Sequence, residues 1–485
     1  MANISYNELT YANRKYTIFA NIFNIQGRAL DLIPDRQNIP LSNISRLELT
    51  SSLTAPIFTG TLEFIVNDFN PFQLILRELY SYLELEITEY SSFKEDASGN
   101  STGDIPRTSF NHIFLITKID MDVVKQKYVR YSIEFISSDI WNIENKIYLG
   151  TGGEEYPILE LMSVAFNTAG LNLNTKAVTT FSTGGGVNKS ISYTSTANDN
   201  LNSIMAYLQK QLLNPKLTTE ESPINCESLV SYIYNHINNT YYLWNLDCIY
   251  QALTIANSRY NDNNTIDSIY VQLGGSIPYM SDNDPNIEIC QYPSTQRLNT
   301  IKSLATYNTY TFDFSKNSFS PVTIDDKIKK GIIESQWLGI NSTADDVFVE
   351  KYKPISYKEY PQGNLDLILD SYHSSSDSHQ SIYKNLINIL LGNDSLLVKT
   401  ACKIDRFPGT VTYITIDESQ ANLAVDKSSS ETDIQFDTRT KWRKLQTLNG
   451  FYAIIGNTMV FEYNELTNTP MFRNYLHLNR PVNIK

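Results

Sequence analysis

The chain has 485 residues, of which 41% are hydrophobic, so it is long enough for two to four domains with ordinary apolar cores. Its formal net charge is −13 and its basic residues form no dense run, which argues against a protein that grips nucleic-acid phosphates. Ordinary solubility explains this acidic balance most simply, although the same charge suits a surface that DNA passes without adhering. The 32 tyrosines, against 4 tryptophans, favour strands and contact surfaces.

The N-terminus is polar and lacks the apolar centre of a signal peptide. No run approaches the roughly 18 apolar residues that a membrane span requires. The four cysteines are widely spaced, without a C-x-x-C pair, which predicts buried thiols in a protein that folds in a reducing cytosol. They are Cys226, Cys248, Cys290 and Cys402.

The first third of the chain alternates apolar and polar residues, as half-buried strands do. Strands are predicted at residues 15–24, 47–49, 62–66 and 83–87, and a hairpin is predicted from residues 112–122 and 127–138 around 124–127. Asn70 and Pro71 begin a short predicted helix with an apolar stripe, and residues 91–109 are predicted to be an exposed loop. At least six strands and a helix between residues 15 and 137 are enough to close a small barrel or sandwich.

The middle of the chain mixes helix and strand patterns. Helices are predicted at residues 156–169, where Gly170 ends the helix, and at 198–212, where Asn214 and Pro215 end it. Ser222-Pro223 opens another predicted helix with Leu229, Ile233 and Ile237 on one face. Strands are then predicted within residues 239–257 and at 307–315, on either side of a helix at 298–305.

The last third repeats the pattern of the first. A helix at residues 377–391 leads directly into a strand at 396–404, and Phe407-Pro408-Gly409 turns the chain into another strand at 410–416. Residues 451–455 and 458–463 are predicted to form a closing hairpin around Gly456-Asn457. Since both ends show a helix feeding a strand and a closing hairpin, an internal duplication is a hypothesis.

The predicted fold class is therefore α+β, mainly β. Two antiparallel β-barrel or sandwich domains enclose an α+β insert, and the alternative that part of the insert's strands completes the second barrel stays open. The predicted domains are residues 1–149, 150–330 and 331–485.

Catalytic patterns are weak throughout. His373 and His379 flank a serine-rich loop, which a solvated loop explains better than a metal site does. Cys402 and His477 could be a nucleophile and its base, but Cys402 lies in an apolar strand pattern, which favours a structural thiol. Residues 99–103 match G-x-S-x-G by chance, because polar loop lies on both sides instead of a strand and a helix.

Two other features also have simpler structural explanations. Residues 150–153 are glycine-rich and precede a helix, but they lack the Lys-Ser/Thr of a phosphate loop, which favours a domain connector. The acidic pairs Glu154-Glu155 and Asp345-Asp346 are better explained as helix-start or loop charges than as a glycosidase pair. The sequence thus predicts no catalytic, metal or cofactor-binding residue, and no interface residues can be named from it. We expect a structural or binding scaffold that is not an enzyme.

In the order and spacing of its elements, the chain resembles the baseplate hub proteins of contractile-tail phages. The stretches that carry the resemblance begin with LSNISRLELTSSLTAPIFTGTLEFIVND at residues 41–68 and include SIYKNLINILLGNDSLLVKTACKIDRFPGTVTYITID at 381–417. The others are residues 137–166, 195–212, 239–247 and 450–463. Residues 215–293 and 421–441 look longer than a minimal hub needs, and the sequence does not indicate their roles.

The resemblance implies two tail-tube-like β domains in each subunit and a homotrimer that presents six such domains in a ring. Such a ring matches the sixfold tail tube on one side and the threefold central spike on the other. The implied partners are the tail tube protein, the central spike protein and baseplate wedge or tape-measure proteins, and DNA passes through without specific binding. The implied location is the virion tail or baseplate, assembled in the host cytoplasm, with no cofactor.

Alternatives from other classes stay open at this point. The chain also fits a tail-tip hub of a non-contractile phage or the hub part of a contractile injection system. A cell-wall hydrolase would be revealed by turnover of peptidoglycan, which we expect to be absent. A sugar-binding adhesin is disfavoured because its tryptophans, Trp141, Trp244, Trp337 and Trp442, are scattered. Since the sequence ends soon after the last predicted hairpin, we expect any spike to be a separate chain.

Overall fold

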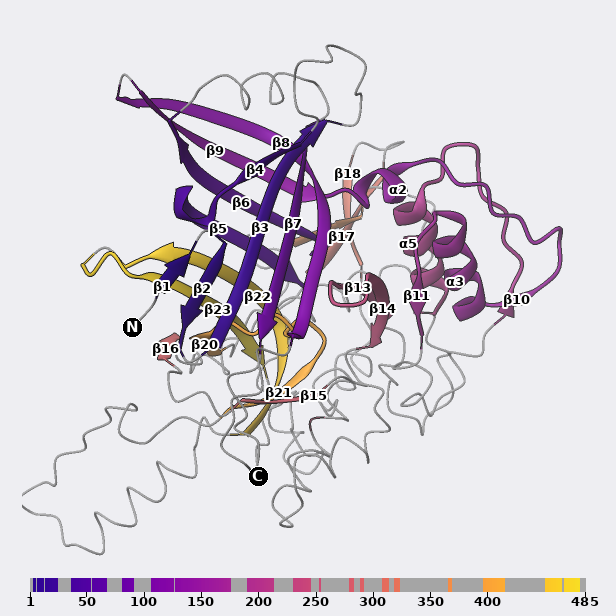
Figure 1. Ribbon diagram of the computed structural model, residues 1–485. Helices are drawn as coiled ribbons and strands as arrows, with labels where there is room; N and C mark the ends of the chain where they lie inside the picture. The colour runs from indigo at the N-terminus through magenta and orange to yellow at the C-terminus, as the bar shows by residue number, and fades with distance from the viewer. Residues whose placement is uncertain are drawn as a thin grey trace, which may run out of the picture. The chain divides into compact units, whose positions relative to one another are not determined.

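The computed structural model of the chain is drawn in Figure 1. It describes residues 3–5, 7–12, 14–24, 36–53, 55–67, 81–90, 106–125, 127–175, 190–212, 230–245, 253, 279–282, 288–291, 308–313, 318–322, 365–368, 396–414, 450–464 and 466–479. Over these residues the fold is mainly β, as the composition and alternation predict. The helices with described bounds are η1, a 3-10 turn (Leu41–Asn43), and α2 (Ile140–Glu144), α3 (Ile158–Thr168) and α5 (Leu201–Leu212).

The chain divides into two compact units, each built from segments that are distant in the sequence. Unit 1 takes in Met1–Ser137, Ile255–Gln291 and Leu397–Leu478, and unit 2 takes in Ser138–Thr254, Tyr292–Leu396 and Asn479–Lys485. The predicted division into two look-alike barrels around an insert stays a prediction.

Unit 1 is organised around one sheet of 15 strands. Its main path runs β1-β2-β3-β7-β8-β9-β6-β5-β22-β23-β20-β16, while β4 pairs with β3 and β15 and β21 join beside β22. The strands from the first third are β1 (Asn3–Ser5), β2 (Glu8–Tyr11), β3 (Arg14–Asn24), β4 (Arg36–Ile39), β5 (Ile44–Ser52), β6 (Ala55–Val66), β7 (Ser81–Tyr90), β8 (Pro106–Lys125) and β9 (Tyr128–Ser137). Those from later segments are β15 (Tyr279–Asp282), β16 (Glu288–Gln291), β20 (Leu396–Ala401), β21 (Val411–Ile414), β22 (Gly450–Tyr463) and β23 (Pro470–Asn479).

The period-two pattern of these strands decides which face of the sheet is buried. Leu47 and Leu49 of β5 lie opposite Leu62 and Gly60 of β6, and the leucines are fully buried. Aromatic rings then fill the core, where Phe64 stacks on Tyr131 and Phe114 meets Phe135 edge to face. The predicted strands at residues 15–24, 47–49, 62–66 and 83–87 are thus confirmed.

The predicted hairpin from residues 112–138 is also confirmed, with Lys125 of β8 paired to Tyr128 of β9. β8 is longer than predicted, because it begins at Pro106 within the stretch expected to be loop. Its first half pairs with β7 and its second half with β9, and a bulge between Ile116 and Lys118 lies close to this change of partner.

β22 joins the two ends of the chain, and here one prediction is wrong. Gly456 and Asn457 do not form a hairpin turn but lie inside a continuous strand of 14 residues. Residues 450–453 of β22 pair with β21, and Gly456 to Glu462 pair with β5 of the N-terminal segment. The local turn preference is overridden because strands on both sides supply ladder partners. The observed closing hairpin is β22–β23, and its turn includes residues 464 and 466–469.

Unit 2 contains the helices α2, α3 and α5 and small sheets. The helix predictions at residues 156–169 and 198–212 are confirmed, and Gly170 has the left-handed φ of +77° expected at a helix end. Within the described part of the chain, no helix is both long and apolar enough to cross a membrane. The strands of unit 2 are β10 (Tyr156–Pro157), β11 (Leu173–Asn174), β12 (Ser190–Ile191), β13 (Val230–Asn235), β14 (Thr240–Asn245), β17 (Asn308–Asp313), β18 (Ser318–Val322) and β19 (Leu365–Ile368).

The predicted helix with Leu229, Ile233 and Ile237 on one face is wrong, because residues 230–235 form β13, which pairs with β14. The segment Val-Ser-Tyr-Ile-Tyr is rich in β-branched and aromatic residues, and pairing with β14 buries Tyr232, Ile233 and Tyr234. The spacing of four residues between Leu229, Ile233 and Ile237 therefore does not reflect a helix. In the strand region predicted within residues 239–257, β14 is confirmed but Leu253 is helical.

Several predicted elements lie outside the described residues. They are the helices at 70–79, 298–305 and 377–391, most of the loop at 91–109, most of residues 215–293 and all of 421–441.

Gly60 allows β5 and β6 to pack tightly against Phe135. A Cβ added at this position would lie 2.2 Å from the backbone oxygen of Glu48 and 2.6 Å from the Phe135 ring. We expect Gly60→Ala to lower the free energy of unfolding by about 2 kcal/mol or more, because relieving the clash requires the paired backbone of β5 and β6 to move apart. Urea denaturation measures this change.

Gly456→Ala is the matched control, because its Cβ would meet His477 at an ordinary 3.5 Å. This variant should be close to neutral or slightly stabilised, since alanine has less backbone freedom to lose. Equal stability of the two variants would contradict the tight packing at Gly60.

Candidate functional site

The structure keeps the candidate dyad of Cys402 and His477 apart. The Cys402 backbone N–H bonds the Phe472 carbonyl of β23, whereas His477 lies five residues further along that strand, roughly 16 Å at ordinary strand rise. Cys402 is fully buried, and burial raises the pKa of its thiol well above the usual value, so it is a structural thiol as predicted. Cys290, by contrast, is exposed on β16, so the prediction of a buried thiol is wrong there.

The other sequence candidates gain no partner in the structure that would make them a site. The glycine-rich stretch at 150–153 forms a turn in which Gly152 and Gly153 have positive φ, and helix α3 begins only at Ile158. Glu154 accepts a hydrogen bond of 3.0 Å from the exposed Tyr156 hydroxyl. Among the described residues, no cluster of His, Cys, Asp or Glu has the arrangement of a metal site. Outside those residues lie Cys226, Cys248, His373, His379, Asp345, Asp346 and residues 99–103.

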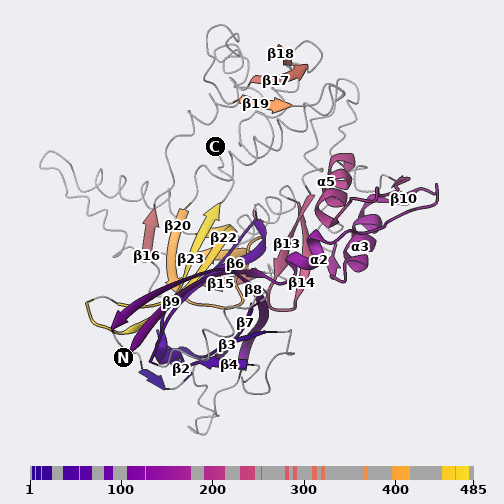
Figure 2. The same cartoon turned by 90° about the horizontal axis from the view of Figure 1, so that it is seen from above.

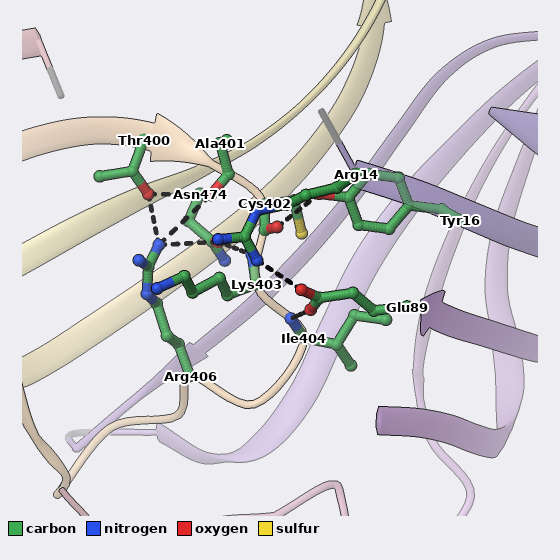
Figure 3. A network of polar contacts seen from close by, with 10 residues as sticks. All are labelled: Arg14, Tyr16, Glu89, Thr400, Ala401, Cys402, Lys403, Ile404, Arg406 and Asn474. Atoms are coloured by element: carbon green, nitrogen blue, oxygen red, sulfur yellow. Dashed lines mark hydrogen bonds and ion pairs between the residues drawn. The ribbon is translucent and has the colours of Figure 1, made fainter. Parts of the chain in front are cut away.

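Polar side chains instead meet inside unit 1, where the chain's two ends come together (Figure 3). We name this set the buried polar cluster. Its members come from β3, β7, β20, β22, β23 and the segment that joins β20 to β21. They are Arg14, Tyr16, Glu89, Thr400, Arg406, Asn457 and Asn474.

Glu89 is the acidic member of the cluster, and its side chain is only 2% exposed. One carboxylate oxygen pairs with the Arg14 guanidinium, and the other accepts the Ile404 backbone N–H at 3.1 Å. The Tyr16 hydroxyl donates to the Cys402 carbonyl at 2.6 Å. Strands β3 and β7 are thereby tied to the start of the segment at residues 402–410.

Arg406 and two asparagines hold the rest of that segment. The fully buried Arg406 guanidinium donates to Thr400 Oγ1 and, at 3.2 Å, to Asn474 Oδ1. Asn474 Nδ2 donates to Asn457 Oδ1 at 2.9 Å, and Asn457 Nδ2 donates to the Arg406 carbonyl at 2.9 Å. Residues 402–410 are buried apart from the half-buried Asp405 and Gly409, so their backbone polar groups need such internal partners.

The buried polar cluster is suited to fastening chain segments together. It holds no exposed nucleophile, and its hydrogen bonds run from the N-terminal strands to the C-terminal ones.

The sequence reasoning missed this cluster although a signal was present. Glu89 continues the apolar face of β7 after Leu83, Leu85 and Ile87, and Asn474 lies on the apolar face of β23. A polar residue at an apolar position of a period-two strand is a mark of a buried hydrogen-bonded group. No pattern in the sequence indicates which residues are their partners.

The opposite face of the sheet carries a second feature, which we name the acidic sheet face. It spans five adjacent strands, β22, β5, β6, β9 and β8, whose opposed residues share one side. Acidic residues outnumber basic ones two to one on it. The acidic residues are Glu48, Glu63, Asp120, Asp122, Glu134 and Glu462, and the basic residues are Arg46, Lys118 and Arg130.

Ion pairs between neighbouring side chains balance part of this negative charge. Lys118 bonds Asp120 at 2.8 Å and Glu134 at 3.0 Å, and Arg46 bonds Glu48 at 2.9 Å. Where β22 meets β5, the hydroxyls of Thr50 and Thr458 lie 3.3 Å apart. The face is therefore mainly polar on both sides of the junction of the two chain ends, where the buried Val460 of β22 lies opposite Glu48.

No family model and no curated protein matches the sequence of this chain. Solved structures do match its fold. They include two tail proteins and a component of a type VI secretion system.

A tail protein from Neisseria meningitidis MC58 has 7% identity and a TM-score of 0.40, and the match covers 96% of each chain. The 43 kDa tail protein of prophage MuSo2 from Shewanella oneidensis has 8% identity and a TM-score of 0.42, with 96% of this chain and 98% of that one covered. The Escherichia coli c3393 protein, a type VI secretion component, has 8% identity and a TM-score of 0.34, with 91% and 77% covered. At scores below 0.5, none of them assigns a function to this chain.

Removing the Glu89 carboxylate should destabilise unit 1 strongly. We expect Glu89→Ala to lower the free energy of unfolding by about 3–5 kcal/mol, because Arg14 and the Ile404 N–H both lose their acceptor. Glu86→Ala on the exposed side of the same strand is the control and should change it by less than about 0.5 kcal/mol. Denaturant titration of both variants measures the difference, and similar losses would refute the role given to Glu89.

Another buried group, His112 of β8, gives the fold a dependence on pH. Its Nε2 lies 2.6 Å from Ser137 Oγ, and its ring meets Phe114 edge to face. Burial lowers the pKa of His112 to about 4 from the usual 6.5. The folded state thus holds the neutral imidazole, while the unfolded chain takes up a proton below pH 6.5.

Stability should therefore fall as the pH drops from 6.5 to 4, with His112 contributing about 3 kcal/mol of the loss. His112→Gln cannot be protonated and should show a shallower decline over the same range. Urea unfolding of both proteins between pH 7 and pH 4 isolates this contribution from that of the carboxylates. Parallel pH profiles would contradict it.

Proposed function

We propose that this chain is a structural protein of a phage tail or of a related injection machine, and that it acts as the hub between tube and spike. Three copies form a ring around a channel, and each copy contributes its large β unit to the wall. The tube protein and the spike protein are the axial neighbours, and baseplate wedge or tape-measure proteins lie beside it. The chain is proposed to have no enzymatic activity.

The acidic sheet face supports this proposal most directly. One side of the strands is an apolar core, and the other is a polar surface five strands wide with excess negative charge. Such a surface suits the wall of a channel, since phosphates are repelled from it and DNA can slide without being bound. Its threonines and paired charges also let a wide sheet stay hydrated on that side.

The junction of the chain ends also supports the proposal. β22 from the C-terminal segment pairs with β5 from the N-terminal segment, so two distant parts of the chain contribute to one wall. If each part supplies one tube-like domain, three copies present six such domains. A ring of this kind has equal repeats for a sixfold neighbour while keeping threefold symmetry for another.

The mass of the purified protein tests the proposal. We expect native mass spectrometry or light scattering to give a trimer, alone or in the presence of the tube and spike proteins from the same tail gene cluster. Obligate rings bury large apolar interfaces, so the trimer should persist at micromolar concentration.

Addition of the tube protein should give a complex of one hub trimer with six tube subunits. Bovine serum albumin added in the same amount serves as the control for non-specific association. A chain that stays monomeric with both partners would overturn the hub assignment.

A further inference from the structure

The turn between β22 and β23 presents a leucine to solvent. We name it the Leu466 loop and define it as residues 464 and 466–469. Leu466 is 95% exposed, more than the other large apolar side chains in the described part of the chain. Single surface leucines are common, so the exposure alone carries no inference.

Hydrogen bonds hold the Leu466 loop in one conformation. The side-chain oxygen of Asn464 accepts the backbone N–H of Leu466 at 2.9 Å and that of Thr467 at 3.1 Å. The backbones of Asn464 and Thr469 are bonded at 2.9 Å, and Asn468 takes the left-handed φ of +50°. A side chain on a fixed loop loses little conformational entropy on binding, so Leu466 is preorganised to insert into a partner.

The chain also offers an apolar acceptor, which we name the β8 edge patch. It consists of Ile119 and Met121, which are 37% and 45% exposed. They lie on the core side of the sheet, since they oppose the buried Ile133 and Tyr131 of β9. From Thr117 onward no described strand pairs with the other edge of β8.

The hairpins that carry the Leu466 loop and the β8 edge patch lie on the same side of unit 1. The β8–β9 and β22–β23 hairpins both project to the left in Figure 1, and Figure 2 shows the same from above. In a ring of three, both neighbours of a subunit lie on its axis-facing side, and each contact joins two different patches. One patch can thus meet the preceding copy and the other the following copy.

Nucleic acid and membranes are less suitable binding partners for the Leu466 loop than a second copy of the chain. Its sequence, Asn-Glu-Leu-Thr-Asn-Thr at residues 464–469, contains no Lys or Arg, so it has nothing to attract nucleic-acid phosphates or anionic lipids. A single leucine would also anchor a protein to a membrane only weakly.

We propose that Leu466 of one copy inserts against the β8 edge patch of a second copy of this chain. This inference rests on the proposed ring and names the contact that closes it. Burial of a leucine favours binding enough that its loss weakens each contact about tenfold or more.

Sedimentation velocity of the full-length protein over a range of concentrations tests the contact. Leu466→Asp should raise the concentration needed for half-assembly about tenfold or more, and Leu466→Met should leave it unchanged. Because Leu466 is outside the core, both variants should keep the wild-type far-UV circular dichroism spectrum, which shows that they fold. If wild type and Leu466→Asp assemble equally well, the contact is refuted while the ring stands. If wild type itself stays monomeric with the tube and spike proteins present, both proposals fail.

A charge pair tests the partner residue. Met121→Asp and Leu466→Lys should each weaken assembly, and the double variant should recover a large part of the loss, since opposite charges then meet across the contact. A double variant that is as weak as the product of the two single effects would refute the pairing of Leu466 with Met121.

Discussion

Unit 1 depends on the pairing of β22 with β5, which brings together segments about 400 residues apart in the sequence. Closing so long a loop costs conformational entropy, and the seven paired positions of this ladder must be supported by burial around them. Apolar residues supply most of that support, since Leu47, Leu49, Met459 and Phe461 are buried side by side. The pairing also sets which face of the C-terminal strands continues the N-terminal sheet.

The buried polar cluster lies at this same junction, and the two features explain each other. Residues 402–410 form a largely buried loop, so their N–H and C=O groups lose water and need partners. Three side chains from different strands supply such partners: Glu89 accepts the Ile404 N–H, Asn474 accepts the Lys403 N–H, and Asn457 donates to the Arg406 carbonyl. Apolar burial has no direction, whereas hydrogen bonds fix how segments are placed, so the cluster gives the junction one arrangement.

This arrangement gives the molecule two kinds of surface with different uses. The acidic sheet face is five strands wide and carries an excess of acidic side chains, which suits a passage along which a polyanion moves. The ends of the β8–β9 and β22–β23 hairpins bear exposed apolar side chains, among them Met121, Tyr128 and Leu466, which suits contacts between subunits.

The sequence by itself determined the mainly β class, most strand positions in the first third, the β8–β9 hairpin and helices α3 and α5, because apolar periodicity and end signals are local. It misjudged Gly456-Asn457 and β13, where neighbouring strands override local preference. A glutamate on the apolar face of β7 could have indicated a buried charge, but its partners Arg14 and Ile404 could not be read from the sequence. Only the tertiary structure decided that the two chain ends share one sheet, because pairing between distant strands depends on contacts that leave no local pattern.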